Sequence, residues 1–419
     1  MTTLTRTMLA IPLLSRLALG AAGGLDPSFG SGGKVVTGFG HNARALDATL
    51  QSDGKLVVVL TLDNTPIATS AFAVARYLSN GTLDASFGRN GLTKIAFTNF
   101  INTPNSVAIQ PDGKIVAGGE AQSADGSVDE FAMARFNANG TLDTSFGTGG
   151  KVTTDFLTTH AGGFHEGANV VLLQPDGKIL LGGVVSSNPD APTDTALARY
   201  NSNGSLDPTF GNGGKVSMIS IGAVNALAVL TDGQILALNN AAGIAQFQSN
   251  GTLVPVTSGT IAVTSHTSIT GFQLDAKFIL AGGGLGPSGE NDLDVKLSRF
   301  LPTGGMDPSF FNSPIFDFGT PGAFTNAAQA FAVGSNGRIA VGGLSQTPSF
   351  GDIFGLARLN SDGTLDSTFG TGGTVTTNFG GSDQVLAVVV QPDGKIIAVG
   401  QTFNTTKSIA NLALARYLQ

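Results

Sequence analysis

The chain has 419 residues with 59 glycines, no cysteine and no tryptophan, and only 12% of its residues are charged. The absence of cysteine excludes disulfides and thiolate metal sites, and a formal net charge of −7 argues against a nucleic-acid-binding surface. Abundant glycine with few charges is typical of many short β-strands joined by tight turns.

Residues 1–22 have the pattern of a secretory signal peptide. Arg6 precedes an apolar run over 8–14, and the small residues over 20–22 offer a cleavage site. Arg16 interrupts the apolar stretch, so a disordered cytosolic leader is the alternative interpretation, and the segment is too short to span a membrane. We therefore expect an exported protein that is secreted, periplasmic or attached to the cell surface.

One turn motif recurs seven times after this leader. The copies are SDGKL at Ser52, PDGKI at Pro111, PDGKI at Pro175, TDGQI at Thr231, LDAKF at Leu274, SNGRI at Ser335 and PDGKI at Pro392. Their spacing of about 43 to 64 residues is too long for a solenoid rung and long enough for a small sheet. The copies between about 211 and 300 depart most from the pattern, which leaves the repeat boundaries there open.

Each copy contains four short predicted strands, which in the second copy lie at 105–110, 114–121, 130–137 and 150–156. Small and branched residues alternate along the first two strands without a clearly polar face, so we expect both faces to be buried. Seven four-stranded antiparallel sheets, each covered by its neighbours, predict an all-β, seven-bladed β-propeller that forms a single domain over 23–419.

The two ends of the chain are expected to complete one blade. The last copy supplies three strands, and the segment 24–39 supplies the missing turn and the fourth strand. We therefore expect residues 33–39 to pair beside residues 412–417. This pairing would close the ring and leave no unprotected end sheet.

The phrases GTLDTSFGTGGKVTTDF, QPDGKI and ALARY resemble the bacterial delta-60 repeat, and the resemblance covers about residues 24–419. It implies an exported or surface-associated propeller, often embedded in larger adhesin-like proteins. The family has no established chemistry and provides no catalytic residues that could be transferred to this chain.

Each repeated phrase carries an arginine and, eight residues later, an aspartate. The pairs are Arg76 with Asp84, Arg135 with Asp143, Arg199 with Asp207, Arg299 with Asp307, and Arg358 with Asp366. The fourth copy loses both and has Gln246 and Val254, as expected for a paired interaction, because a buried charge without its partner costs about 3–5 kcal/mol. By the same spacing, Arg416 should pair with Asp26. We interpret these residues as structural rather than as ligand-binding arginines.

One face of the predicted propeller is rich in histidine and acid. The loops that enter the first strands contain His41, His160, His165 and His266, and the loops between the second and third strands contain one base, Lys407. The acids of these loops are Asp63, Glu120, Asp125, Asp129, Glu130, Asp190, Asp194, Glu290, Asp292 and Asp352. Such a face serves solubility or attracts cations or a basic partner. The opposite face should be more basic, with Lys55, Lys114, Lys178, Arg338 and Lys395 in its turns.

Polar side chains also recur near the start of the first strands, at Asn105, Asn169, Asn225, Ser268 and Gln329. If the innermost strand begins there, they border a central channel. They would either satisfy nearby backbone groups or hold water, an ion or a small polar ligand. The candidate ligand-binding residues of the chain are His41, Asn105, His165, Glu166, Asn169, Asn225 and His266.

The leading hypothesis is a non-enzymatic, monomeric binding or structural module without a cofactor, whose partner is an unknown protein or polysaccharide. The alternative is a metal-dependent lyase or hydrolase in which His41, His165, Glu166 and His266 bind a divalent cation at the channel mouth. No Gly-x-Ser-x-Gly elbow, HExxH helix or phosphate loop occurs, so nucleophilic hydrolysis and nucleotide chemistry have no support.

Overall fold

In the computed structural model the protein is all-β, and the described residues form 27 strands and no helix. That part of the chain accordingly offers no helix capable of crossing a membrane. The described residues are 20–64, 69–97, 101–122, 129–157, 165–186, 194–218, 222–239, 243–255, 267–272, 277–285, 293–301, 305–310, 314–319, 326–347, 351–404 and 408–419. Residues 1–19 of the predicted leader lie outside them.

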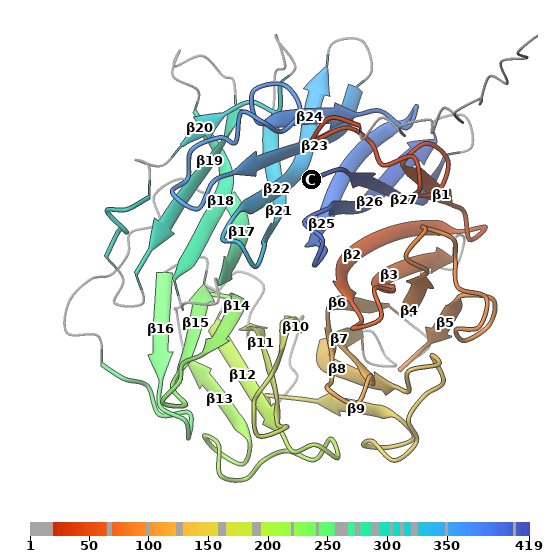
Figure 1. Cartoon of the computed structure of the whole chain (residues 1–419). Helices are drawn as coiled ribbons and strands as arrows, with labels where there is room; N and C mark the ends of the chain where they lie inside the picture. Colours follow the sequence, from red (N-terminus) through yellow and green to blue (C-terminus); the bar gives the residue numbers. More distant parts are fainter. Residues whose placement is uncertain are drawn as a thin grey trace, which may run out of the picture.

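The strands form antiparallel sheets that follow one another along the chain (Figure 1); in the described residues six sheets have four strands and one has three. The first sheet consists of β2 (Asn42–Leu50), β3 (Leu56–Asn64), β4 (Thr69–Tyr77) and β5 (Leu92–Ile95). The second consists of β6 (Asn102–Ile109), β7 (Ile115–Gln122), β8 (Asp129–Phe136) and β9 (Lys151–Thr154). The third consists of β10 (His165–Leu173), β11 (Ile179–Ser186), β12 (Asp194–Tyr200) and β13 (Lys215–Met218).

The fourth sheet is the three-stranded one and lies in the region where the repeats depart from the pattern. It consists of β14 (Val224–Val229), β15 (Ile235–Asn239) and β16 (Gly243–Phe247). The fifth has β17 (Thr267–Phe272), β18 (Phe278–Leu285), β19 (Leu293–Phe300) and β20 (Ile315–Phe316). The sixth has β21 (Asn326–Val333), β22 (Ile339–Thr347), β23 (Gly351–Leu359) and β24 (Thr374–Thr377).

The seventh sheet joins the two ends of the described chain. It is ordered β25 (Ser382–Val390), β26 (Ile396–Asn404), β27 (Ile409–Tyr417) and β1 (Lys34–Thr37). Lys34 lies opposite Ala415, and Thr37 lies opposite Leu412. The pairing of the N-terminal segment with the last strand is therefore the one that the sequence predicts.

Two kinds of glycine explain the repeated motifs. Gly113 adopts a left-handed φ of 83° in the Asp-Gly turn between β6 and β7, where the Lys114 carbonyl accepts the Gln110 amide at 2.8 Å. Gly119 faces the β-bulge of β6, and a Cβ at that position would lie 1.9 Å from the Thr103 carbonyl oxygen. The second glycine of the Gly-Gly pair is therefore required by the close approach of the bulged strand.

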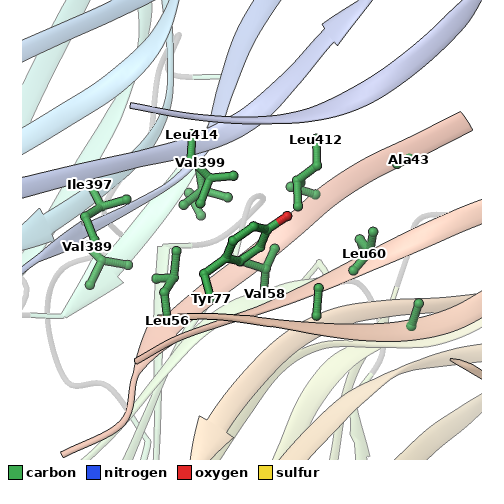
Figure 2. Close-up of a cluster of buried hydrophobic side chains, with 14 of the residues drawn as sticks. Ala43, Leu56, Val58, Leu60, Tyr77, Val389, Ile397, Val399, Leu412 and Leu414 are labelled. Atoms are coloured by element: carbon green, nitrogen blue, oxygen red, sulfur yellow. The ribbon is translucent and has the colours of Figure 1, made fainter. Parts of the chain in front are cut away.

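Adjacent sheets bury their faces against each other. Every sheet contacts the next one along the chain, and β2 of the first sheet contacts β25, β26 and β27 of the seventh. Figure 2 shows this last core, where Leu56, Val58 and Tyr77 meet Val399 and Leu414. Burial on both faces explains why the inner strands lack a polar face.

Deletion of residues 20–39 should destabilise the fold, because it removes β1 and also Asp26, the carboxylate partner of buried Arg416. The unpaired arginine alone is expected to cost about 3–5 kcal/mol. Thermal unfolding followed by circular dichroism should show a lower and broader transition. Deletion of residues 2–19 is the control and should leave the transition unchanged; equal behaviour of the two deletions would contradict this account.

Candidate functional site

The six arginines of the repeated phrase each lie beside the aspartate eight residues later or, for Arg416, beside Asp26. In every pair the arginine Nε donates to the aspartate Oδ2 at 2.8 to 3.0 Å. Both members are buried, with at most 6% of each residue exposed. The second carboxylate oxygen accepts hydrogen bonds from the residue two positions further on, as Asp143 does from Ser145.

Each arginine also contacts an aromatic ring and, in five cases, the following sheet. The Arg135 guanidinium stacks over Phe146 with its carbon 4.4 Å from the ring centroid, and its Nη1 donates to the Ser202 carbonyl of the third sheet. In the fifth sheet, Arg299 Nη1 donates to the Ser361 carbonyl at 2.6 Å. We call this unit of arginine, aspartate and phenylalanine the clamp. The clamps thus hold the arginines inside the fold.

The basic turns on the face opposite the histidines lie beside these aspartates, and their lysines also pair with exposed aspartates of the same turns. Lys395 Nζ lies 3.1 Å from Asp26 Oδ2, and Arg338 Nε lies 3.3 Å from Asp366 Oδ2. Burial would raise the pKa of Asp26, but hydrogen bonds from Ser28 and Lys395 and the charge of Arg416 lower it to about 2. This face, which we call the turn face, is therefore less basic than its lysines and arginine suggest.

The amides near the start of the inner strands lie at β-bulges and bond to the next sheet. Asn105 donates its side-chain NH₂ to the Ala168 carbonyl at 3.0 Å, and Asn169 donates to the Val224 carbonyl at 3.1 Å. Asn169 also donates to Asn225 Oδ1 at 3.3 Å. The structure thus brings three of the predicted ligand-binding residues together, and these hydrogen bonds join the first strands of neighbouring sheets. Ser268 lies in β17.

Asp47 makes a related link that the sequence does not predict. Its carboxylate on β2 accepts the backbone NH of Ala48 at 2.8 Å and that of Val107, on β6, at 2.9 Å. Burial raises the pKa of Asp47 to about 6, although hydrogen bonds from Val107, Ala48 and Ser106 oppose the shift. The sequence does carry a signal for this link. Asp47 directly follows the bulged residue of β2, and the bulged residue is an asparagine in β6, β10 and β14.

Glu166 is fully buried and holds a loop of its neighbouring sheet. Its two carboxylate oxygens accept the backbone NH groups of Phe156 at 2.9 Å and Leu157 at 3.1 Å. Asp383 accepts the Phe379 NH in the same way, and Asn102 accepts the Phe97 NH. In these three sheets, the residue three positions before the bulge of the first strand accepts backbone NH groups of a loop. That loop follows the fourth strand of the preceding sheet. This arrangement does not match a metal ligand at a channel mouth.

His165 lies at the start of β10 and contacts acids of the second sheet. Its Nδ1 is 2.9 Å from Asp129 Oδ2, and a Cβ at Gly167 would lie 2.7 Å from Glu120 Oε2. The hydrogen bond to Asp129 raises the pKa of His165 against the effect of burial, and the charge of Glu120 adds to the rise. Burial raises the pKa of Glu120.

Two of the four histidines lie in the described residues, and they stand at the start of different sheets. His41 lies just before β2, while His160 and His266 fall outside the described residues. Among the described residues no group of three histidine, aspartate or glutamate side chains is arranged to hold a metal ion.

The face that carries the acid-rich loops, which we call the loop face, also has a basic residue on a strand, which an inspection of the loops alone does not find. Arg44 on β2 is exposed, and its charge lowers the pKa of Asp63 while burial, the larger effect, raises it. The described acids of this loop face are partly exposed: Asp63, Glu120, Asp129, Glu130, Asp194 and Asp352. Asp125, Asp190, Glu290, Asp292 and Lys407 lie outside the described residues.

Five segments of the chain match the family described as "Domain of unknown function (DUF5122) beta-propeller", at residues 51–87, 110–146, 174–210, 334–369 and 391–419. These five segments are β-propeller repeats. Each matched segment contains an Asp-Gly or Asn-Gly turn and the arginine of a clamp.

Several solved structures have a similar fold but low sequence identity to this chain. A protein of unknown function from Dyadobacter fermentans is 11% identical with a TM-score of 0.49, covering 92% of this chain and 97% of its own. YCF48 bound to D1 peptide is 12% identical (TM-score 0.47; 95% and 100% covered). A catalytically inactive virginiamycin B lyase from Staphylococcus aureus with quinupristin is 11% identical (TM-score 0.45; 91% and 98% covered). No curated protein matches the chain. Similarity at this level carries no information on function.

Replacement of Asp143 by Val should destabilise the protein by about 3–5 kcal/mol, because buried Arg135 loses its charge partner. The double variant R135Q/D143V imitates the natural fourth sheet and should cost at least about 1 kcal/mol less than the sum of the single changes. Urea unfolding of the four proteins measures the coupling. Additive effects would contradict the clamp.

The pKa of His165 should lie above its ordinary value of about 6.5 and fall when Asp129 is replaced by Asn. Since the protonated form is the one stabilised, this contribution to folding is present below about pH 6.5 and is lost as the pH rises through the raised pKa. NMR titration of the ring protons measures the change. Glu130→Gln is the matched control, and an unchanged pKa in the Asp129 variant would contradict the contact.

Proposed function

We propose that residues 23–419 form one closed seven-bladed propeller of the delta-60 repeat type. The succession of seven sheets supports this, as do the contact of the seventh sheet with the first and the pairing of β1 with β27. Arg416 and Asp26, 390 positions apart, reproduce the clamp of the other sheets, with Arg416 Nη1 donating to the Ser79 carbonyl of the first sheet.

We further propose that this propeller is an exported, monomeric binding module whose loop face contacts a basic protein partner. The proposal rests on one observation. Among the described residues, the negative charge of the loop-face acids exceeds the positive charge of the basic side chains there, whereas the bases of the turn face are paired with aspartates. Charge that is not neutralised within the fold remains available to attract a partner of opposite sign. Residues 1–22 support export by their composition.

The metal-dependent alternative gains no support from the described residues. Glu166 uses both carboxylate oxygens on backbone NH groups, and His165 pairs with Asp129. The binding proposal therefore rests on the surface rather than on the channel.

Binding of a fluorescent oligolysine peptide tests the proposed surface. The loop-face variant D129N/E130Q/D352N should bind at least about threefold more weakly at low salt, and the difference should shrink as added salt screens the charges. The variant D53N/D112N/D393N removes the same charge from exposed aspartates of the turn face and serves as the control. Equal loss in both variants, or no binding by the unmodified protein, would contradict the proposal.

A further inference from the structure

Asn-Gly dipeptides recur in the turns of this chain, and each is a place where a side chain can react with the backbone. Because glycine has no side chain, its nitrogen can closely approach the amide carbon of the preceding asparagine. Seven such pairs occur, all within the described residues, with the asparagine at Asn80, Asn90, Asn139, Asn203, Asn212, Asn250 and Asn336. Their hydrogen bonds distinguish one pair from the other six.

Deamidation of such a pair needs a free glycine NH and a free asparagine side chain. The glycine nitrogen loses its proton and forms a bond to the asparagine Cγ. The bond from Cγ to Nδ2 breaks, and the proton leaves with the side-chain nitrogen as ammonia. Water then opens the cyclic imide at either carbonyl, which yields aspartate or isoaspartate. A hydrogen bond that holds the glycine NH or the asparagine Oδ1 must break first, so it slows the reaction.

Five pairs have both groups engaged in hydrogen bonds. In the second sheet, the Gly140 NH donates to the Asn137 carbonyl at 2.8 Å. Asn139 Oδ1 accepts the backbone NH of Thr141 at 3.1 Å and its hydroxyl at 2.8 Å. The corresponding glycine NH and asparagine Oδ1 are also bonded at Asn80, Asn203, Asn250 and Asn336.

The Asn90 pair has only its glycine engaged. The Gly91 NH donates to the Phe87 carbonyl at 2.8 Å, and Gly91 is buried. The Asn90 side chain makes no hydrogen bond within the described part of the chain. The attacking nitrogen is therefore held in this pair, although the side chain is free.

The Asn212 pair has both groups free. Asn212 opens the tight turn before β13, where its NH donates to the Lys215 carbonyl at 2.8 Å and the Lys215 NH donates back at 3.3 Å. Neither the Gly213 NH nor the Asn212 side chain makes a hydrogen bond to any described residue. Both residues are exposed, and a Cβ built at Gly213 would have no neighbouring atom within 4 Å. The turn is therefore uncrowded and open to water.

The same turn in other sheets has no reactive side chain at this position. The residues that bridge to the start of the outer strand are Ser31, Thr148 and Thr371, where the third sheet has Asn212. The reactive pair therefore arises from one substitution in an otherwise repeated turn.

We propose that Asn212 is a deamidation site of the folded protein and that the hydrogen bonds of their turns protect the other Asn-Gly pairs. The reaction adds a negative charge beside β13, the edge strand of the third sheet. The isoaspartate product also lengthens the backbone of the turn by a methylene group.

Peptide mapping by mass spectrometry of the full chain, incubated at mildly alkaline pH, tests the proposal. In the folded protein, Asn212 should convert at least about tenfold faster than any other Asn-Gly pair. In guanidinium chloride, where the protecting hydrogen bonds are absent, the seven pairs should convert at similar rates. Conversion of Asn90 as fast as Asn212 in the folded protein, or retention of the preference for Asn212 in guanidinium chloride, would overturn the proposal.

A matched pair of variants moves the site between sheets. Asn212→Thr introduces the residue of the equivalent turns and should abolish the fast conversion. Thr148→Asn creates the same pair with Gly149, which has a φ of 60° like Gly213 and also has a free NH. This variant should gain a second site that converts at a rate similar to that of Asn212. No conversion at the new site in the folded variant would overturn the proposal.

Discussion

The buried guanidinium group is the constraint on which the architecture depends. Six arginines lie inside a fold with few charges, and burial without partners would be prohibitive. Each therefore has a carboxylate at its Nε and a phenylalanine beneath its plane, and five also reach a carbonyl of the next sheet. Because this last bond crosses between sheets, the clamp couples the turn of each sheet to the position of its neighbour.

A second set of polar contacts acts at the inner strands. Bulged amides such as Asn105, the carboxylate of Asp47 and the loop-holding Glu166 all satisfy backbone groups of adjacent sheets. Residue types that suggest a channel site are thus used for assembly. Partly exposed carboxylates remain on the loop face, and the proposed function rests on these groups.

Departures from the repeat are the informative places in this fold. The fourth sheet replaces the clamp with Gln246, whose side chain donates to Gln234, so the loss of both charges leaves no unpaired ion. The sixth sheet keeps its arginine but lacks the carbonyl acceptor. That difference leaves Arg358 Nη1 buried without a hydrogen bond to another protein group.

The sequence by itself predicted the repeated four-stranded units, the pairing of β1 with β27 and the arginine–aspartate pair of each clamp; the fourth sheet has only three strands in the described residues. The sequence could do so because turns and the eight-residue spacing of Arg135 and Asp143 are local and repeat along the chain. Only the tertiary structure decided the contacts of Glu166, Asp47 and Arg44 and the missing partner of Arg358. These depend on how residues of different strands and sheets meet, and the path of one strand against its neighbour is not encoded in any single repeat.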